Sequence, residues 1–395
     1  MMMYAVLSNP NHPKYGVATI PFPIPRDQYT YCMDLLEALE VGDAVKADCK
    51  VVEFDSVYTV LKRMKALTVN VEELNYLVKR LESFDTGEAA QFQAMAHKLE
   101  LFELKDLINL TFCCQQATVI TDFSDLAAIG RDHYMNLHGG SAKTEELDAL
   151  DGKETARQLI ENGGGTITPY GVVYDNGMKL EQVYDGRFFP CYYYEPNVIT
   201  VAATSKNEPE DTKHITWLHL PMIQEEIDRA LLRGGITDPA DVRLRLEDSQ
   251  LPNEVDVLLD MEYETLSDLN ELAEATDGLS NADMEKLGAA VMLAKPKSAA
   301  QIKNLAESLD LFDLAPGAHT PQDYGKYMIR QSGRFEYDEN LDAFYDYEKY
   351  GTERMNEEDG MFTDRGYIAY KGYISMEEVM NGGQSNHMVL GGLSR

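Results

Sequence analysis

The sequence predicts an α+β protein, an elongated multi-domain chain in which one pattern of elements occurs twice. Its 395 residues exceed what a single hydrophobic core usually holds, so we expect two or more domains. Short segments of alternating apolar residues, typical of strands, are interspersed with longer segments whose apolar residues follow a helical period. The same order of segments occurs in both halves. Each repeat is expected to contain a small antiparallel α/β module, a helical bundle and a second α/β module.

The first repeat is expected to open with a hairpin and a helix. Its strands are predicted at Tyr4–Ser8, Tyr15–Phe22, Lys46–Phe54, Ala117–Ile120 and Ile167–Tyr174. Its helical segments are predicted at Arg26–Leu39, Ser56–Leu110, Phe123–Leu137 and Glu154–Glu161. Asn70 and Thr86 are expected to cap helices, because each is followed by an acidic residue two or three positions later.

The second repeat follows a tyrosine-rich connector and has the same order. Its strands are predicted at Asn197–Thr204, His214–Leu220 and Val242–Leu246. Its helices are predicted at Gln224–Leu232, Leu266–Thr276, Asn281–Ala294, Ala299–Leu309, Pro321–Arg330 and Leu341–Tyr350. The expected domains are α/β modules at 1–66, 116–182, 197–262 and 317–380, helical bundles at 67–115 and 263–316, a connector at 183–196 and a flexible tail at 381–395.

Four short matches between the halves support a tandem duplication of a unit of roughly 180 residues. Glu73–Leu77 matches Asp268–Leu272, and Leu104–Leu107 matches Ile302–Leu305. The other two pairs are Phe123-x-Asp125-x4-Gly130 with Phe344-x-Asp346-x4-Gly351, and Gly165-x-Ile167-Thr168-x-x-Gly171 with Gly360-x-Phe362-Thr363-x-x-Gly366. The first and last pairs share an offset of 195 residues. Two unrelated α+β domains remain the alternative.

The composition excludes several classes of function. The chain is 44% apolar and 26% charged, as globular proteins are, and carries 35 basic and 67 acidic residues. A formal net charge of -32 argues against direct binding to nucleic acid or to anionic lipid, both of which require basic surfaces. The five cysteines are odd in number and widely spaced, which indicates free thiols in the cytoplasm. No segment is typical of a signal peptide or a membrane span.

No catalytic, metal or cofactor site is predicted. His133 and His138 stand five apart, which does not suit metal ligands on one helix face. Cys113 and Cys114 directly follow an apolar helix end, which is typical of buried small residues. The triple glycine at 163–165 lacks the Lys-Ser/Thr of a phosphate-binding loop. The chain is therefore expected not to be an enzyme.

A long run of the sequence carries only negative charges, and the features above do not explain it. Leu246–Glu285 contains 13 acidic residues and neither Lys nor Arg, although helices usually gain from opposite charges four residues apart. Residues 198–395 carry a net charge of -20, against -12 for residues 1–197. The predicted acidic surface includes Glu247, Asp248, Glu254, Asp256, Asp260, Glu262, Glu264, Asp268, Glu271, Glu274, Asp277, Asp283 and Glu285. Strong acidity that serves solubility alone is the simpler alternative.

Phe335–Tyr370 combines eleven acidic residues with nine aromatic rings. We expect the rings to pack inward and the carboxylates to line an outer face, because charge resists burial and large rings favour it. Five further acids of this stretch belong to the predicted surface: Asp342, Glu348, Glu357, Glu358 and Asp359.

The same stretch carries a family resemblance. Phe344-Tyr345-Asp346-Tyr347-x-x-Tyr350-Gly351 and Gly360-x-Phe362-x-x-x-Gly366 resemble the ArdA antirestriction proteins of mobile genetic elements, and Asn197–Leu309 is similar more loosely. The resemblance implies an acidic, elongated mimic of bent B-form DNA that occupies the DNA-binding groove of type I restriction-modification enzymes. It also implies dimers, formed in that family by chains about half this length. This chain is twice that length, so the expected arrangements are a homodimer, a covalent pseudo-dimer, or a mimic whose added half has another target.

The expected partner is thus a type I restriction-modification enzyme, through its DNA-binding and methyltransferase subunits. A net charge of -32 corresponds to the phosphates of roughly 16 base pairs of duplex DNA. The alternative is an acidic adaptor that binds another basic DNA-associated protein without catalysis.

Overall fold

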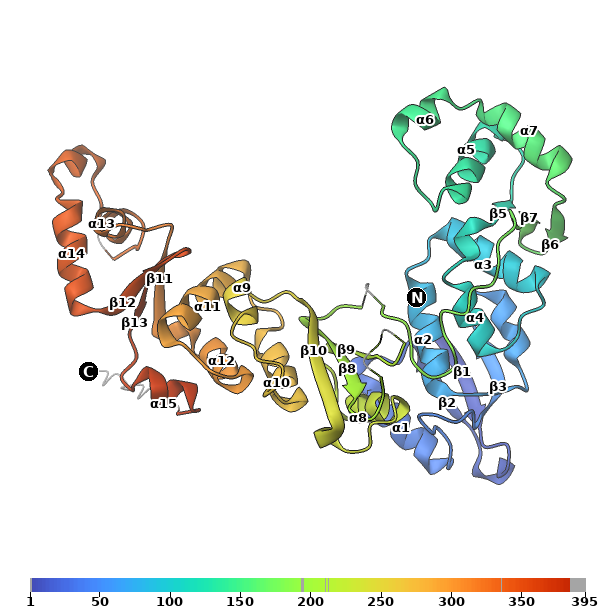
Figure 1. Ribbon diagram of the computed structural model, residues 1–395, viewed down its shortest axis with the longest axis horizontal. Helices are drawn as coiled ribbons and strands as arrows, with labels where there is room; N and C mark the ends of the chain where they lie inside the picture. The colour runs from blue at the N-terminus through green and yellow to red at the C-terminus, as the bar shows by residue number, and fades with distance from the viewer. Residues whose placement is uncertain (1, 193–194, 210, 212, 335, 384–395) are drawn as a thin grey trace, which may run out of the picture. The chain divides into compact units, whose positions relative to one another are not determined.

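The computed structural model describes residues 2–192, 195–209, 211, 213–334 and 336–383 (Figure 1). The chain divides into two compact units. Unit 1 comprises Met1–Tyr194, Thr204–Trp217 and Ile223–Val242, and unit 2 comprises Glu195–Ala203, Leu218–Met222 and Arg243–Arg395. Phe335 and most of the predicted tail, from residue 384 on, lie outside the described residues. The mixture of small antiparallel sheets and helices confirms the predicted α+β class.

Unit 1 opens with a four-stranded sheet of order β2-β1-β3-β4. Its strands are β1 (Met3–Ser8), β2 (Ala18–Phe22), β3 (Cys49–Asp55) and β4 (Thr68–Val69), with α1 (Tyr29–Ala38) between β2 and β3. Strand β1 alternates as expected, because Met3, Ala5 and Leu7 are buried. The strand predicted from Tyr15 begins only at Ala18, because Pro13 starts a short 3₁₀ helix that ends at Tyr15.

Three helices follow the sheet: α2 (Val71–Glu82), α3 (Thr86–Lys98) and α4 (Leu104–Leu110). Leu74, Leu77, Val78 and Leu81 bury one face of α2, as their spacing predicts. Asn70 caps α2 as expected, since its side chain accepts the backbone N–H of Glu73 at 3.0 Å.

The predicted cap of α3 is one residue too late in the sequence. Asp85 is the cap, and Glu88 completes a reciprocal pair of cap bonds with it. Thr86 is instead the first helical residue. The segment before α2 also differs from expectation, because Thr59–Met64 is a 3₁₀ helix and Thr68–Val69 is strand β4.

The last part of the first half is a three-stranded sheet with helices inserted in it. The strands β5 (Thr118–Ile120), β6 (Thr166–Thr168) and β7 (Gly171–Tyr174) have the order β5-β7-β6. The helices α5 (Leu126–Leu137), α6 (Thr144–Ala149) and α7 (Gly152–Asn162) lie between β5 and β6 in sequence. Gly130 on α5 and Gly152 on α7 meet backbone to backbone, leaving no room for a Cβ at either position.

The second half begins with a sheet of order β10-β8-β9. It contains β8 (Ile199–Ser205), β9 (Thr216–Leu220) and β10 (Val242–Ser249), with α8 (Gln224–Arg233) between β9 and β10. Four helices follow in unit 2: α9 (Asn253–Asp256), α10 (Leu266–Thr276), α11 (Asn281–Ala294) and α12 (Ala299–Ala306). The bounds of α10 and α11 agree with the sequence prediction.

Unit 2 ends with a sheet of order β11-β13-β12. Its strands are β11 (Phe312–Pro316), β12 (Asp359–Thr363) and β13 (Gly366–Tyr370), and α15 (Met376–Met380) follows them. Helices α13 (Pro321–Arg330) and α14 (Tyr347–Glu357) pack together between β11 and β12 in sequence (Figure 1). The helix predicted at Leu341–Tyr350 is wrong in its bounds: a 3₁₀ helix spans Glu339–Phe344, and α14 starts after its cap Asp346.

The two halves have the same order of sheets and main helices. In both, an asparagine of a bundle helix accepts a backbone N–H next to the preceding sheet: Asn75 on α2 from Ile24, and Asn270 on α10 from Met222, each at 2.8 Å. One of the four sequence matches, however, pairs helices that do not correspond. Its first segment, which ends in Gly130, lies at the start of α5, the first helix after β5. Its second segment, which ends in Gly351, lies at the start of α14, the second α-helix after β11. By element order α5 corresponds to α13, and α7 corresponds to α14.

Candidate interaction surface of the second unit

The predicted acids fall into three groups by exposure. Those that are exposed are Glu247, Asp248, Asp260, Glu262, Glu271, Glu274, Asp277, Glu285, Glu348, Glu357 and Asp359. Those that are half-buried are Glu254, Asp256, Asp268, Asp283, Asp342 and Glu358. Glu264 alone among them is buried. The acids are therefore not equivalent, and their partners decide which of them can face another molecule.

Glu264 does not lie on the surface where the sequence predicts it. The residue is only 9% exposed, and both carboxylate oxygens accept the backbone N–H of Ala299 at 3.0 Å. This N–H is at the start of α12, where a helix has unsatisfied donors and favours negative charge. Burial raises the pKa of Glu264. The residue fixes the entry into α12 and is not part of an outward face.

Arg365 supplies the cation that the acidic run lacks in sequence. Its guanidinium donates to both oxygens of Glu254, at 2.9 and 2.7 Å, and lies 2.6 Å from a carboxylate oxygen of Glu285. The hydrogen bonds from Arg365 are the main cause that lowers the pKa of Glu254. Lys303 likewise pairs with Glu271 at 3.1 Å. The expectation that this run is unneutralised is therefore wrong for these three acids and for Glu247, which pairs with Arg245 at 3.0 Å.

The sequence contains a local signal for the position of Arg365. Thr363 Oγ1 accepts the backbone N–H of Arg365 at 3.2 Å and donates to the carbonyl of Gly366 at 2.9 Å, so the turn between β12 and β13 is fixed. Gly366 has a φ of 133°, which favours glycine, and a Cβ there would collide with the carbonyl of Ala315. The threonine and glycine of this turn are evident in the sequence, but the contact of Arg365 with Glu254 on α9 and Glu285 on α11 is not.

Replacing Arg365 with alanine is expected to lower the free energy of unfolding of unit 2 by about 1–3 kcal/mol, because Glu254 loses a partly buried partner. The pKa of Glu254 should rise toward its ordinary value. Because that pKa is lowered in the folded protein, the interaction stabilises above pH 4.5 and its contribution is lost as pH falls through the folded pKa. Hydrogen–deuterium exchange of α9, α11 and β13 at pH 7 measures the effect.

Arg245→Ala is the matched control for this prediction. Arg245 pairs with Glu247 at 3.0 Å, but its side chain is mostly exposed, so its removal should change stability by less than about 0.5 kcal/mol. Equal exchange rates in the Arg365 variant and the wild type would show that the Arg365 contacts carry no stability.

Asp268 and Asp283 have local roles at helix starts. Asp268 accepts the hydroxyl of Thr265 at 2.7 Å at the start of α10, and Asp283 accepts the hydroxyl of Ser280 at 2.7 Å at the start of α11. Asp256 is different, because one of its oxygens is buried without a hydrogen-bond partner in the described structure, and burial raises its pKa. These three carboxylates are only partly available to a partner.

Asp342 and Glu358 turn toward donors within the aromatic stretch. Asp342 accepts hydrogen bonds from Tyr347, from Tyr337 at 2.7 Å and from Arg330, and these bonds lower its pKa to about 2. Glu358 accepts a hydrogen bond from the hydroxyl of Tyr324 at 2.6 Å and forms ion pairs with Arg354 and Lys371. The prediction that rings pack inward and acids outward therefore holds only in part.

Five predicted acids are exposed, and their carboxylates accept no hydrogen bond or ion pair from the described residues. These unpaired acids are Asp248, Glu262, Asp277, Glu348 and Asp359. They lie on or beside β10, α10, α14 and β12 of unit 2. Because no cation of the described chain contacts them, their charge remains available to a partner.

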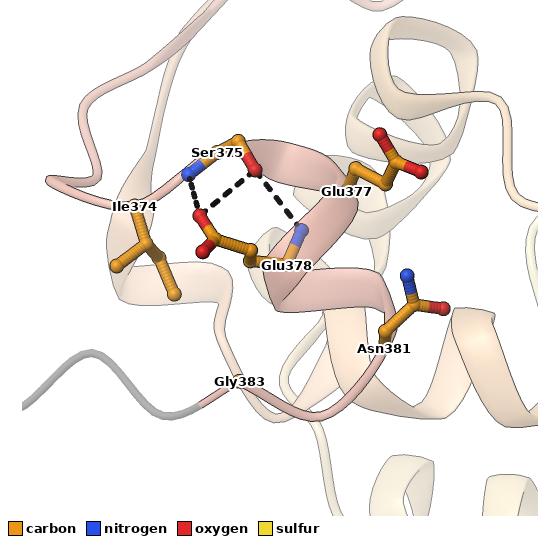
Figure 2. Close-up of a pocket in the computed structure, with 6 residues that line it drawn as sticks. All are labelled: Ile374, Ser375, Glu377, Glu378, Asn381 and Gly383. Carbon is orange, nitrogen blue, oxygen red and sulfur yellow. Dashed lines mark hydrogen bonds between the residues drawn. The ribbon is translucent and has the colours of Figure 1, made fainter.

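A shallow pocket of about 450 Å³ lies at α15, away from these acids in sequence (Figure 2). It is lined by Ile374, Ser375, Glu377, Glu378, Asn381 and Gly383. Figure 2 shows the carboxylate of Glu378 bonded to the backbone N–H and hydroxyl of Ser375, both at 2.9 Å. These bonds lower the pKa of Glu378. Its carboxylate therefore serves to cap α15 and is not suited to transfer protons.

Metal binding and membrane insertion find no support in the part of the chain that the structure describes. Within it, no three His, Cys, Asp or Glu side chains form a group that could hold a metal ion. None of the helices in these residues combines the length and apolar character needed to cross a membrane.

Comparison with known proteins identifies the domain to which the unpaired acids belong. The family model of the antirestriction protein ArdA matches residues 212–369, a range that includes every predicted surface acid. No curated protein matches the chain. The matched range extends from just before β9 to the last residues of β13 and agrees with the resemblance found in the sequence. Residues 212–369 therefore resemble the antirestriction protein ArdA, and we call this range the ArdA domain.

Proposed function

We propose that the ArdA domain of this chain inhibits type I restriction-modification enzymes by occupying their DNA-binding groove in place of B-form DNA. The observation that carries the proposal is the position of the unpaired acids. All five lie inside the range that matches the ArdA family, and none is neutralised by a described cation. A DNA-binding groove presents the opposite charge, because it must neutralise phosphates.

The charge of the domain supports this interpretation over acidity for solubility alone. Residues 212–369 contain 33 acidic and 15 basic residues, a formal net charge of -18. The domain thus carries more than half of the net charge of -32 in about 40% of the chain. Charge that served solubility would have no reason to concentrate in one domain.

We further propose that the first half is a divergent copy of the same unit. Its sheets have the corresponding orders, β2-β1-β3 and β5-β7-β6 against β9-β8-β10 and β11-β13-β12. The chain would then be either a covalent pseudo-dimer or one subunit of a homodimer. Size-exclusion chromatography with light scattering distinguishes the two arrangements.

The direct test is inhibition of a purified type I restriction-modification enzyme by the full chain. We expect restriction to be blocked in proportion to added protein, and duplex DNA to compete with the protein for the enzyme. Binding should weaken as salt rises, because the charges on both sides are screened. Measuring methylation in the same assay shows whether modification is blocked as well.

Two results would overturn the proposal. The first is no binding to the enzyme at low salt. The second is binding that duplex DNA does not displace, because such a complex would leave the groove open. Capture of a basic DNA-associated protein other than a restriction enzyme would support the adaptor alternative instead.

A further inference from the structure

Leu341 and Phe344 form an exposed apolar pair in an otherwise acidic part of the ArdA domain. Phe344 is 84% exposed and Leu341 is 49% exposed. Both belong to the 3₁₀ helix Glu339–Phe344, in which residues three apart lie on the same side. The two side chains therefore face outward together. We call them the apolar pair.

The turn that carries the apolar pair is held in place by Asp342. This residue lies between the two in sequence and accepts hydrogen bonds from Arg330, Tyr337 and Tyr347. Arg330 also donates to the hydroxyl of Tyr347 at 3.1 Å. The turn is thus fixed to α13 and α14 through Asp342, so the apolar pair is presented in a defined position.

The segment that carries the apolar pair is acidic, although Arg330 on α13 pairs with its Asp342. Residues 336–348 contain six acidic residues and neither Lys nor Arg. Five of the six are exposed: Glu336, Asp338, Glu339, Asp346 and Glu348. A partner that covers this turn must therefore be basic around its edge. An exposed ring within such an acidic segment resembles the aromatic anchor residues that dominate binding energy in protein interfaces.

The corresponding segment of unit 1 lacks this arrangement. Between α5 and α7 the chain has no aromatic residue after His138, and Leu147 and Leu150 are half-buried. The positions that correspond to Asp342 and Phe344 at the offset of 195 are Leu147 and Ala149. The apolar pair and its support are therefore specific to the second half, where the ArdA match lies.

We propose that Leu341 and Phe344 anchor the ArdA domain in an apolar site between the basic residues of the partner's DNA groove. This inference rests on the proposed function. The acids would steer the encounter and contribute a salt-dependent share of the affinity, whereas the apolar pair would contribute a share that salt does not screen. A mimic built of carboxylates alone would lose nearly all affinity at high salt.

The test compares the affinity of the full chain for a type I restriction-modification enzyme at several salt concentrations. We expect Phe344→Ala to weaken binding about tenfold at every salt concentration and to leave the slope of log Kd against log salt unchanged. Leu341→Ala should act in the same way with a smaller factor. Thermal unfolding of both variants should match the wild type, because neither side chain is buried.

Two control substitutions test whether the loss of any exposed apolar side chain weakens binding. Tyr373 is 96% exposed in unit 2 but lies outside the ArdA match, and Ile167 is 83% exposed in unit 1. Tyr373→Ala and Ile167→Ala should leave the affinity within about twofold of the wild type.

The outcomes separate this inference from the proposed function. If the wild type does not bind the enzyme, the proposed function fails. If the wild type binds and Phe344→Ala binds equally well, the anchor fails and the proposed function stands. If Phe344→Ala changes the slope of log Kd against log salt, the anchor proposal also fails, because the effect of the substitution would then be electrostatic.

Discussion

Replacing Asp248, Glu262 and Asp277 together by lysine is expected to weaken binding to a type I restriction-modification enzyme on the order of a hundredfold at low salt. Each substitution puts a positive charge where the groove is also positive, and such like-charge contacts cost several kcal/mol in an interface. The loss should shrink as salt rises, because exposed charges are screened. Titrating inhibition of the endonuclease at two or more salt concentrations measures it.

These three residues suit the test because their carboxylates have no described partner to lose. Asp248 lies on the edge strand β10, Glu262 lies between α9 and α10, and Asp277 directly follows α10. Reversing Asp268 and Glu271 would be less clear, because Asp268 contributes to the cap of α10 and Glu271 pairs with Lys303. In the chosen variant, the free energy of unfolding should change by less than about 0.5 kcal/mol per site.

The matched control reverses three exposed acids of unit 1, Glu145, Asp148 and Glu161. This variant has the same net charge as the test variant, so a difference between them isolates the position of the charge. We expect the control to weaken inhibition far less, because unit 1 lies largely outside the ArdA match. Equal losses in the two variants would mean that net charge alone drives binding, and would contradict an acidic face on unit 2.

Helices with strong local signals could be predicted from the sequence. The bounds of α10 and α11 agree with prediction because Thr265 and Ser280 cap them and their apolar residues follow a helical period. Strand β11, in contrast, has no prediction in the sequence. It is short, and its partner β13 lies more than 50 residues later, so a local pattern carries little information about it.

The candidate surface shows the same division between local and distant information. The acids of Leu246–Glu285 are evident in the sequence, but the cation that neutralises Glu254 comes from Arg365, 111 residues away. The buried role of Glu264 likewise depends on the start of α12, 35 residues away. The composition of a surface could therefore be predicted, whereas the pairing that removes acids from it depends on tertiary contacts.

Arg233→Ala is expected to lower the free energy of unfolding of unit 1 by about 3–5 kcal/mol. Arg233 on α8 is 4% exposed. Its guanidinium donates to the carbonyls of Ala44, Gly186 and Arg187 at 2.9–3.0 Å. It also donates to the side chains of Asn70, Glu73 and Tyr184. Alanine would leave these acceptors, including the carboxylate of Glu73, without this donor.

The single tryptophan, Trp217, offers a direct readout because it belongs to unit 1. Urea unfolding followed by its fluorescence should show an earlier transition in Arg233→Ala. Arg233→Lys should lose almost as much, since an ammonium on a flexible stem cannot replace a planar group that meets six acceptors. Arg157→Ala is the control in the same unit, because Arg157 is mostly exposed and its ion pair with Glu154 spans 3.8 Å. If Arg233→Ala and Arg157→Ala unfold at the same urea concentration, the buried network does not hold α8 against α2, and the stability of unit 1 must come from its apolar core alone.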